Sequence, residues 1–378
     1  MTTPTRPLRI LHVITSVGPT NGQYNEHCLP LARTREIAIC SVFPASIKTP
    51  PEITVFEGDG TVRGFLRALR SALAARDYDV VHAHAAVAGM GLLAANLLGR
   101  RSMSNCVYTI QNSYRNYRLR NRLLLYAMFA AFPRIVLCSN AVEASMPSSL
   151  RRLGRGRTAV VANAVDTRRA ERVSADRPRR DGFTVVSVGR LIPIKNASTV
   201  IGAFDGARDA DSRLVFVGDG SLRPELRADA DRRSMNGQVV FTGLVERDDV
   251  YRHVAEGDVV VSASRGEGLP VAVLEAMACG RPVILSDIPP HREIVDREGF
   301  VPLIPPDDVD GFASELRRYR DMPEGERERL GAECRRLVEE RFGLEAMHRD
   351  YIPIYTHVMG SRVDREAVEL VIPSGDLR

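Results

Sequence analysis

Two glutamates lie eight positions apart in the segment RGEGLPVAVLEAMACG (265–280), which is otherwise mostly apolar. Glu267 lies in a glycine-rich turn, and we expect Glu275 to lie in a helix that begins at Pro270, because proline favours the first helical position. Ionised carboxylates accept hydrogen bonds from vicinal hydroxyls. The pattern predicts that Glu275 binds a ribose and Glu267 another sugar in one crevice. For Glu275, a buried acid satisfied by backbone donors is the alternative.

Two cations follow a strand-like run in the segment SVGRLIPIKN (187–196). Arg190 and Lys195 lie on a turn that Pro193 stiffens. Of the 52 basic residues in the chain, only Lys48 and Lys195 are lysines. Fixed positive charge suits a diphosphate leaving group, whose negative charge grows as the bond to it breaks. Two solvated surface cations are the alternative.

Small residues end four consecutive strand-like runs in the second half of the chain. They are Gly189, Gly218 with Gly220, Gly243, and Ser264 with Gly266. In open parallel sheets, ligands bind outside the carboxyl ends of the strands. Glycines there let backbone amides approach phosphate oxygens, and helix N-termini favour negative charge. The spacing predicts a nucleotide or phosphate-ester site, with purely structural turns as the alternative.

Several other chemistries lack their motifs. The chain has no GxGxxG, no GxxxxGK[ST] and no HExxH, and its sequence suggests no His, Cys and Asp cluster for a metal. The DxD triplets at 77–79, 209–211 and 229–231 precede strands or lie in helical stretches, so we expect surface acids there. We therefore predict no cofactor and no metal requirement. The six cysteines lie far apart, and we expect buried, reduced thiols.

Strand-like runs alternate with helical stretches along both halves of the chain, which predicts parallel sheets. We expect an α/β fold with two doubly wound, Rossmann-like domains that face a central cleft. The expected boundaries are a first domain over 1–167, a linker over 168–182, a second domain over 183–343, and a C-terminal helix and tail over 344–378. That helix could cross back to the first domain.

Composition sets the broad class of the protein. The 378 residues exceed one ordinary core, and 44% hydrophobic with 26% charged residues is typical of a soluble globular protein. No apolar run is long enough to span a bilayer and the start does not resemble a signal peptide, so we expect a cytoplasmic protein. Residues 1–167 carry 20 basic and 9 acidic side chains, which favours an anionic partner for the first domain. We do not expect that partner to be a nucleic acid.

Four segments together resemble the donor domain of glycosyltransferase family 4: VGRLIPIKN, VGDGSLRPEL, FTGLVERDDV and EGLPVAVLEAMACGRPVI. Glu267 and Glu275 match the pair of glutamates of this family. ILHVITSVGPTNGQ is similar to its N-terminal glycine loop, DVVHAHAAVAG to a strand of its first domain, and VVANAVD to its Asn-Gly-Val-Asp segment. The resemblance implies the GT-B fold and a retaining, metal-independent transfer.

The resemblance also implies roles for individual residues. Arg190 and Lys195 would hold the donor diphosphate, Glu275 the ribose, and Glu267 the transferred sugar. The remaining donor-site positions would be Gly18, Gly22, Gly189, Gly218, Leu244, Val245, Gly268, Leu269 and Pro270. Leu244 and Val245 would lie near the base, and the leaving diphosphate would take the proton of the acceptor.

Two positions depart from the family pattern. Gln111, after the run VYTI, stands where family members commonly carry a histidine that is often called catalytic. A glutamine amide can donate a hydrogen bond but cannot carry charge, so the rate or the sugar preference could differ. The loop GPTNGQ is also longer than the usual paired glycine. His84 is expected to be a structural histidine at a strand end, or to line the cleft.

Four arginines stand in and just before the apolar stretch of residues 115–132. Basic charge beside an apolar face is typical of an interfacial helix, but also of a buried crossover helix with a solvated start. An anionic or lipid-linked acceptor, peripheral contact with the inner face of a membrane, and a soluble acceptor all remain open.

We expect a retaining glycosyltransferase of hexosyltransferase type that moves a sugar from a nucleoside-diphosphate sugar, with UDP favoured, to an acceptor hydroxyl. The alternatives are a nucleotide-sugar epimerase on the same fold and a catalytically weak sugar-nucleotide-binding protein.

Overall fold

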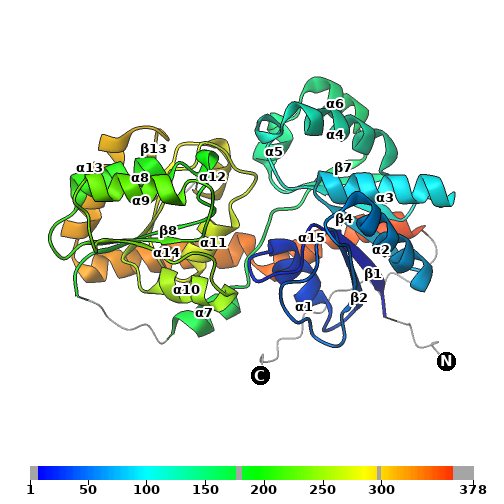
Figure 1. Ribbon diagram of the computed structural model, residues 1–378, viewed down its shortest axis with the longest axis horizontal. Helices are drawn as coiled ribbons and strands as arrows, with labels where there is room; N and C mark the ends of the chain where they lie inside the picture. The colour runs from blue at the N-terminus through cyan, green and yellow to red at the C-terminus, as the bar shows by residue number, and fades with distance from the viewer. Residues whose placement is uncertain (1–6, 176–180, 296–298, 361–378) are drawn as a thin grey trace. The chain divides into compact units, whose positions relative to one another are not determined.

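The computed structural model describes residues 7–175, 181–295 and 299–360. The chain divides into two compact units. One comprises the residues up to 162 together with those from 345 onward, and the other comprises residues 163–344. Each unit has helices packed against a parallel sheet (Figure 1), and each is described by itself below.

The first unit contains a seven-stranded parallel sheet in the order β3-β2-β1-β4-β5-β6-β7. Its strands are β1 (Arg9–Ile14), β2 (Glu36–Ser41), β3 (Thr54–Glu57), β4 (Val80–His84), β5 (Cys106–Ile110), β6 (Arg134–Leu137) and β7 (Thr158–Val160). The central strands are nearly continuous apolar runs because helices cover both faces of such a sheet. The order reverses direction beside β1, so the carboxyl ends of β1 and β4 mark the edge where a doubly wound sheet binds ligands.

The helices of the first unit are η1 (Gln23–Cys28, a π-helix), α1 (Leu29–Leu31), α2 (Val62–Ala75), α3 (Ala86–Gly99), η2 (Tyr114–Asn116, a 3₁₀ turn), α4 (Leu119–Ala131), α5 (Asn140–Ser145), α6 (Ser148–Leu153) and α15 (Leu344–Met359). α2 is an example of a helix whose start is set by its own sequence. The side chain of Thr61 accepts a hydrogen bond from Gly64 N at 3.0 Å and caps the helix. Its buried stripe, with Phe65 and Leu69, then faces the core.

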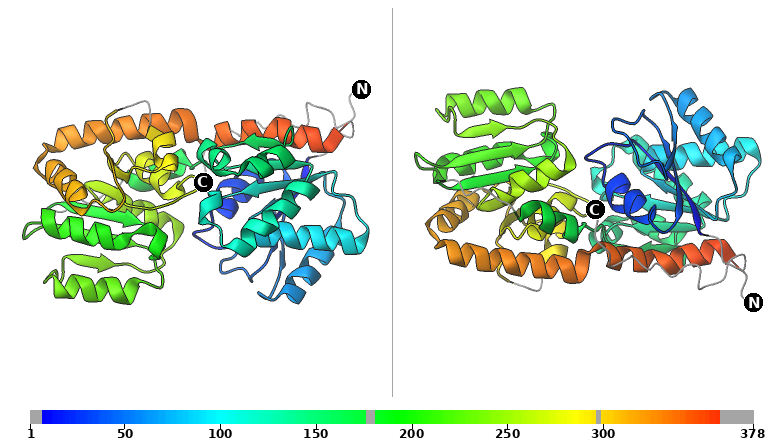
Figure 2. Two further views of the ribbon diagram at one scale, coloured as in Figure 1. Left: turned by 90° about the horizontal axis from the view of Figure 1, so that it is seen from above. Right: turned by 90° about the horizontal axis from the view of Figure 1, so that it is seen from below.

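α15 docks on this unit through tyrosines. Tyr355 Oη lies 2.9 Å from His82 Nδ1 on β4, and Tyr351 Oη lies 3.2 Å from Thr109 Oγ1 on β5. Figure 2 shows α15, in red, alongside the strands of the first unit. The C-terminal helix therefore packs on the N-terminal sheet, as the sequence had left open.

The second unit contains a six-stranded parallel sheet in the order β10-β9-β8-β11-β12-β13. Its strands are β8 (Thr184–Val188), β9 (Arg213–Val217), β10 (Val239–Phe241), β11 (Val259–Ser262), β12 (Val283–Ser286) and β13 (Leu303–Ile304). The strand order reverses direction at β8, which lies between β9 and β11. In a doubly wound sheet, ligands bind at the carboxyl ends of the strands at such a point.

The helices of the second unit are α7 (Thr167–Ser174), η3 (Pro193–Lys195, a 3₁₀ turn), α8 (Ala197–Ala207), α9 (Arg223–Arg232), α10 (Arg247–Ala255), α11 (Val271–Ala278), α12 (Pro289–Val295), α13 (Val309–Asp321) and α14 (Glu324–Phe342). α8 and α13 lie on one side of the sheet, and α10 and α14 on the other (Figure 1). Phe204, Phe216 and Phe312 are buried in the core between α8, α13 and the strands.

Three features differ from the expectation. Residues 168–174, expected to be linker, continue α7, because Asp166 accepts a hydrogen bond from Arg169 N at 2.9 Å and caps that helix. The short edge strands β3 and β13 were not expected. The rest of the expected linker includes residues 176–180, which, like 361–378 in the expected tail, lie outside the described residues.

The structure bears on two expectations, one about the cysteines and one about membrane-spanning segments. All six cysteines are buried, and burial raises the pKa of Cys334 to about 12, so this thiol stays protonated at neutral pH. Among the described residues, none of the helices has the length and hydropathy needed to cross a membrane.

Candidate active site

The carboxyl ends of β8 and β9 approach each other so closely that glycine is required there. Gly218 has φ +136°, and a Cβ on it would lie 2.2 Å from Gly189 O. A Cβ on Gly220 would lie 2.3 Å from Leu191 O. Leu191 N donates to Asp219 O at 2.9 Å and locks the two turns together. The result is a sheet edge of backbone without side chains, to which an anionic group can come close.

Lys195 and Glu267 meet at this edge. Lys195 ends the turn η3, and its Nζ donates to Glu267 Oε1 at 2.6 Å. Ser264 Oγ donates to the same oxygen at 2.7 Å. Arg265 N donates to Ile194 O at 2.8 Å, so the two loops that carry the charges are tied by backbone as well. The partly buried pair is held by several contacts and is stronger than an exposed salt bridge.

A second layer of hydrogen bonds continues behind Glu267. Ser286 Oγ donates to Ser264 O at 2.6 Å, and His291 Nδ1 lies 2.8 Å from Ser286 O, which it can only reach as a donor. The His291 Nε2 atom is buried and has no hydrogen-bond partner among the described residues. Burial lowers the pKa of His291 to about 4, although the negative charge of Glu267 opposes this shift. His291 is therefore neutral and holds the loop of Ser264 in place.

Glu275 lies on α11 and is buried against an arginine. Arg247 Nη2, at the start of α10, lies 2.5 Å from Glu275 Oε1, and the two side chains are only 7% and 4% exposed. Burial raises the pKa of Glu275, opposed by the positive charges of Arg247, Arg169 and Lys195. The alternative of a buried acid satisfied by backbone donors is right about burial and wrong about the partner, because the nearest counter-charge is the Arg247 side chain.

The turn between Glu267 and α11 is held by a residue from a distant segment of the chain. Asn163 Nδ2, in the segment VVANAVD, donates to Leu269 O at 3.0 Å. Gly268, Leu269 and Pro270 are all buried, and Pro270 occupies the position just before α11. With the Leu269 side chain in the core, this turn presents backbone rather than side chain to a ligand.

Comparison with known proteins adds the family. The model described as glycosyl transferases group 1 matches residues 182–321, and the model described as Glycosyltransferase Family 4 matches residues 42–169. Among curated proteins, the chain is 29% identical over 321 residues to the putative glycosyltransferase EpsD of Bacillus subtilis, covering 80% of this chain and 82% of that protein. The chain is a glycosyltransferase of the GT-B type, similar to family 4.

Another curated glycosyltransferase and a solved structure are similar to this chain. A UDP-Gal:alpha-D-GlcNAc-diphosphoundecaprenol alpha-1,3-galactosyltransferase of Escherichia coli is 28% identical over 266 residues, covering 65% of this chain and 67% of that protein. The solved structure of HepE from Anabaena with UDP and glucose superposes with a TM-score of 0.73 at 15% identity, covering 92% of this chain and 99% of that chain. The match to HepE shows that the two share the fold.

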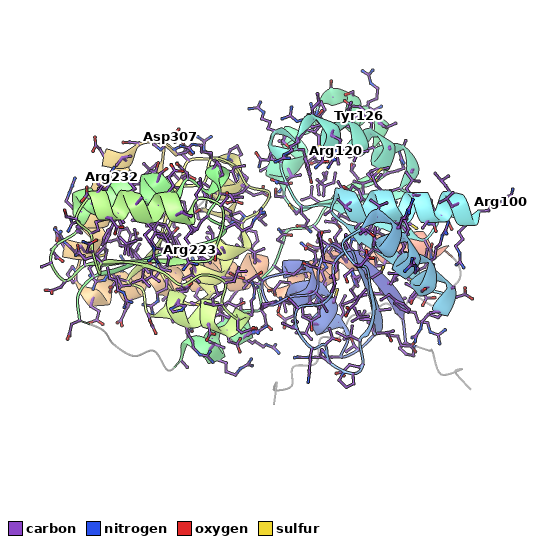
Figure 3. The ribbon with its side chains drawn as sticks, in the orientation of Figure 1. Arg100, Arg120, Tyr126, Arg223, Arg232 and Asp307 are labelled. Atoms are coloured by element: carbon purple, nitrogen blue, oxygen red, sulfur yellow. The ribbon has the colours of Figure 1, made fainter. Side chains whose placement is uncertain are left out.

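The other predicted donor residues of this glycosyltransferase lie along the same edge or next to it. Arg190 is exposed directly after Gly189, and Leu244 is 72% exposed beside the half-buried Val245. Arg223, the first residue of α9 and labelled in Figure 3, has its Nη1 3.0 Å from Asp219 Oδ2. These positions place exposed or partly exposed side chains around the glycine edge.

Gly18, Gly22 and Gln111 belong to the first unit of the glycosyltransferase, not to the unit of Glu267. Gly18 and Gly22 bracket the loop after β1, and Gln111 is half-buried just after β5. Asn25 Nδ2 donates to Pro19 O at 3.1 Å and to Asn21 O at 2.9 Å, so this longer loop is closed by its own amides. It leads into the π-helix η1, a geometry that often marks functional sites.

Three residues of the donor-side network were not predicted from the sequence: Asn163, Arg247 and His291. Ser264 was predicted only as a small residue at a strand end, not as a partner of Glu267. For Arg247 the spacing carried no signal, because its partner Glu275 is 28 positions away. The segment VVANAVD was noticed only as a resemblance, although an asparagine at a strand end, three residues before the helix cap Asp166, is a residue type that binds backbone groups. His291 follows two prolines in a segment that reads as a helix start.

Proposed function

We propose that this glycosyltransferase retains the anomeric configuration and moves a sugar from a nucleoside-diphosphate sugar, with UDP favoured, to an acceptor hydroxyl. One observation carries the proposal. Lys195 donates to Glu267, and its charge also acts on Glu275, next to the turns after β8 and β9 whose close approach only glycine allows. HepE binds UDP, and the galactosyltransferase relative uses UDP-Gal, which supports UDP. A hexosyltransferase needs this combination of a diphosphate-binding edge and carboxylates for hydroxyls.

In this proposal each charge has its own part of the donor. Lys195 and Arg190 contact the diphosphate, and Glu275 accepts hydrogen bonds from the ribose while Arg247 holds it ionised. Glu267, with the backbone of Gly268 and Leu269, binds hydroxyls of the sugar. Since the Lys195 ammonium carries three N–H donors, it can keep Glu267 oriented and bind a phosphate oxygen at the same time.

The proposed step needs few groups. The bond between the anomeric carbon and the diphosphate oxygen breaks, a bond from the acceptor oxygen forms on the same face, and the acceptor proton passes to the departing diphosphate. The increase of negative charge on that diphosphate is stabilised by Lys195 and Arg190. Because these fixed cations take the place of a divalent ion, we propose that transfer proceeds without a metal.

For the acceptor we propose an anionic, lipid-linked molecule at the inner face of a membrane. The galactosyltransferase relative acts on a diphosphoundecaprenol-linked sugar. On α4, Leu119 and Leu123 are 72% and 64% exposed, and Arg115, Arg118 and Arg120 nearby are exposed too. Figure 3 labels Arg120 on this helix. Exposed leucines ringed by arginines suit an anionic bilayer surface, so the crossover-helix interpretation alone does not account for this helix.

The donor is tested first by a thermal-shift panel of UDP-, GDP-, ADP- and dTDP-sugars. A ligand that binds only the folded state must raise the melting temperature. We expect one nucleotide to shift the wild type and to shift Lys195→Ala less. No shift with any nucleotide would refute the donor site.

Turnover separates the transferase from a mere sugar-nucleotide-binding protein. With the selected donor and a polyprenyl-diphosphate-linked sugar, the transferase releases nucleoside diphosphate in the presence of EDTA, and NMR of the product shows retention. Donor binding without release, in the wild type and in Gln111→His alike, would favour the binding protein. Conversion of the donor sugar to an epimer would favour the epimerase.

The membrane contact is tested by co-sedimentation with vesicles that contain phosphatidylglycerol. We expect wild-type protein to bind and the double variant Leu119→Ser/Leu123→Ser to bind weakly. Leu97→Ser/Leu98→Ser is the matched control, because these leucines at the end of α3 are 70% and 65% exposed. Equal loss in both double variants would remove α4 as the membrane contact.

A further inference from the structure

Three histidines from two neighbouring strands lie on one face of the first sheet. His12 on β1 is the register partner of His82 on β4, and His84 follows two positions later. Residues two apart on a strand point to the same face. One nitrogen from each of the three imidazoles lies within 4.8 Å of the others, and His12 Nδ1 is 3.1 Å from His84 Nε2. Sequence alone does not reveal this cluster, because His12 lies about 70 residues before His82 and His84 and only the pairing of β1 with β4 brings them together.

The cluster is sealed from water and incompletely hydrogen-bonded. His12, His82 and His84 are at most 1% exposed. Within the part of the chain that the structure describes, His12 Nε2 and His84 Nδ1 have no hydrogen-bond partner. Burying a polar atom without a partner is costly, and such atoms in a native protein require an explanation. Neutral imidazole nitrogens are ligands that first-row transition metals prefer.

Two hydroxyl groups next to the cluster hydrogen-bond to His82, as groups that orient metal-ligating histidines do. His82 Nδ1 lies 2.9 Å from Tyr355 Oη, and His82 Nε2 lies 2.7 Å from Thr109 Oγ1. Hydrogen bonds of this type fix the ring orientation of ligating histidines. Either hydroxyl can turn away and leave one His82 nitrogen for a metal, while the other keeps the ring in place.

A fourth imidazole stands next to the three. The His27 ring, on η1, has its centroid 5.2 Å from that of His84 and 6.2 Å from that of His82. Its Nδ1 is buried and has no hydrogen-bond partner in the described residues. In a tetrahedral zinc site, with Zn–N bonds of about 2.0–2.1 Å, ring centroids are roughly 5 Å apart. Three of the six centroid distances in this group, at 5.2–5.5 Å, are close to that. Metal binding would lengthen the His82–His84 distance of 3.9 Å and draw His27 nearer to His12 and His82, from which its ring is now 6.3 and 6.2 Å away.

We propose that His12, His82 and His84 bind a divalent transition metal of the zinc type, with His27 in reach of the fourth position. The ion is structural: it joins β1 and β4 to η1, and so fixes the end of the loop that contains Gly18 and Gly22. It lies in the other unit from Lys195 and Glu267. The proposal therefore does not rest on the proposed transfer reaction, which needs no metal in the donor site.

The test uses the full-length, tag-free protein, with Zn²⁺ and Co²⁺ as probes. After loading and removal of free metal, we expect about one zinc ion per chain by mass spectrometry, and a melting temperature that rises with Zn²⁺. Co²⁺ in the same site should give visible absorption bands of a four- or five-coordinate ion with imidazole ligands. Zinc should displace these bands.

Variants locate the ion. His84→Gln and His12→Gln should each lose most of the bound metal and the cobalt bands. His357→Gln is the matched control because His357 is exposed on α15, and it should keep both. Should the glutamine variants not fold, the wild-type cobalt spectrum still decides. A wild type with zinc content far below one per chain and no cobalt bands, or equal binding in all variants, would overturn the proposal and leave a purely hydrogen-bonded imidazole cluster.

Discussion

The two units both gather titratable groups at their central parallel strands and the segments that follow them, but the groups are charged in one unit and neutral in the other. In the second unit Lys195 pairs with Glu267, and Arg247 pairs with Glu275. In the first unit the groups are the imidazoles of His12, His82 and His84, whose burial lowers their pKa values. A buried or partly buried group can keep its charge if a partner of opposite charge is near, whereas a buried cluster of imidazoles without such a partner must be neutral or bind a cation.

The buried pair of the second unit gives the largest expected effect. Arg247→Met leaves Glu275 as a buried carboxylate without its nearest counter-charge, and breaking such a pair costs about 3–5 kcal/mol of unfolding free energy. Urea denaturation measures this loss. The melting-temperature shift by the donor should fall as well, because Glu275 is no longer held ionised towards the ribose.

A double variant separates charge from packing. Arg247→Met/Glu275→Met removes both charges at similar volume, so it should be more stable than Arg247→Met alone while still failing to bind the donor. Arg247→Lys should recover part of both properties. If Arg247→Met were as stable as the wild type and bound the donor equally well, the pair would have neither role.

Glu267 tests the partly buried pair with Lys195 through activity rather than stability. Glu267→Gln keeps the size of the side chain but removes the charge that accepts from Lys195 and, in our proposal, from the sugar. We expect a loss in kcat of about 100- to 1,000-fold, the scale seen when one group that stabilises a transition state is removed. Binding of nucleoside diphosphate, measured by calorimetry, should be largely intact. A normal turnover number would exclude Glu267 from the site.

His291 in the second unit is buried and neutral, as the histidines of the first unit are, and its titration makes the free energy of unfolding depend on pH. Its folded pKa of about 4 lies below its ordinary value of 6.5, so between these pH values the unfolded chain binds a proton that the folded chain does not. Stability must therefore fall as pH decreases from 6.5 to 4, by on the order of 3 kcal/mol for this group.

His291→Asn isolates that contribution, since asparagine does not titrate and can still donate to Ser286 O. Unfolding free energies of wild type and variant at pH 7, 5.5 and 4.5 should converge as the pH falls, because only the wild type has the additional loss. Parallel curves over this range would show that His291 does not titrate as inferred.

The sequence predicted the second unit better than the first for a physical reason. Lys195 and Glu267 lie in turns after strands and Glu275 in the helix that follows, where glycine spacing and proline reveal the turns, so all three could be proposed as site residues from the sequence. Their partners could not: Arg247 and Asn163 act across the fold, and a contact between distant segments leaves no local pattern. The linker was predicted wrongly for a different reason: the cap at Asp166 is local, but the arginine-rich stretch after it lacks the apolar period that indicates a helix.

In the first unit the histidines lie inside strands, where periodicity predicts only burial. His82 and His84 read as core positions of β4, and His12 as one of β1; only the strand order, which places β1 beside β4, joins them. The edge strands β3 and β13 were missed because they are short, with four and two residues. Strand order and long-range contacts are therefore what the structure added.

Lys195 gives the smallest effect, and it tests whether the charged edge of the second unit binds a phosphate or only pairs with Glu267. Lys195→Ala removes one charge-assisted contact to the diphosphate, which corresponds to about 10- to 100-fold weaker donor binding. It also removes the partner of Glu267, so Lys195→Arg serves as the control that keeps the charge. If calorimetry shows the same loss for nucleoside diphosphate as for the intact donor, the lost contact is with phosphate. If only the sugar-bearing donor binds more weakly, Lys195 acts through Glu267, and the diphosphate must then be held by Arg190 and the glycine backbone.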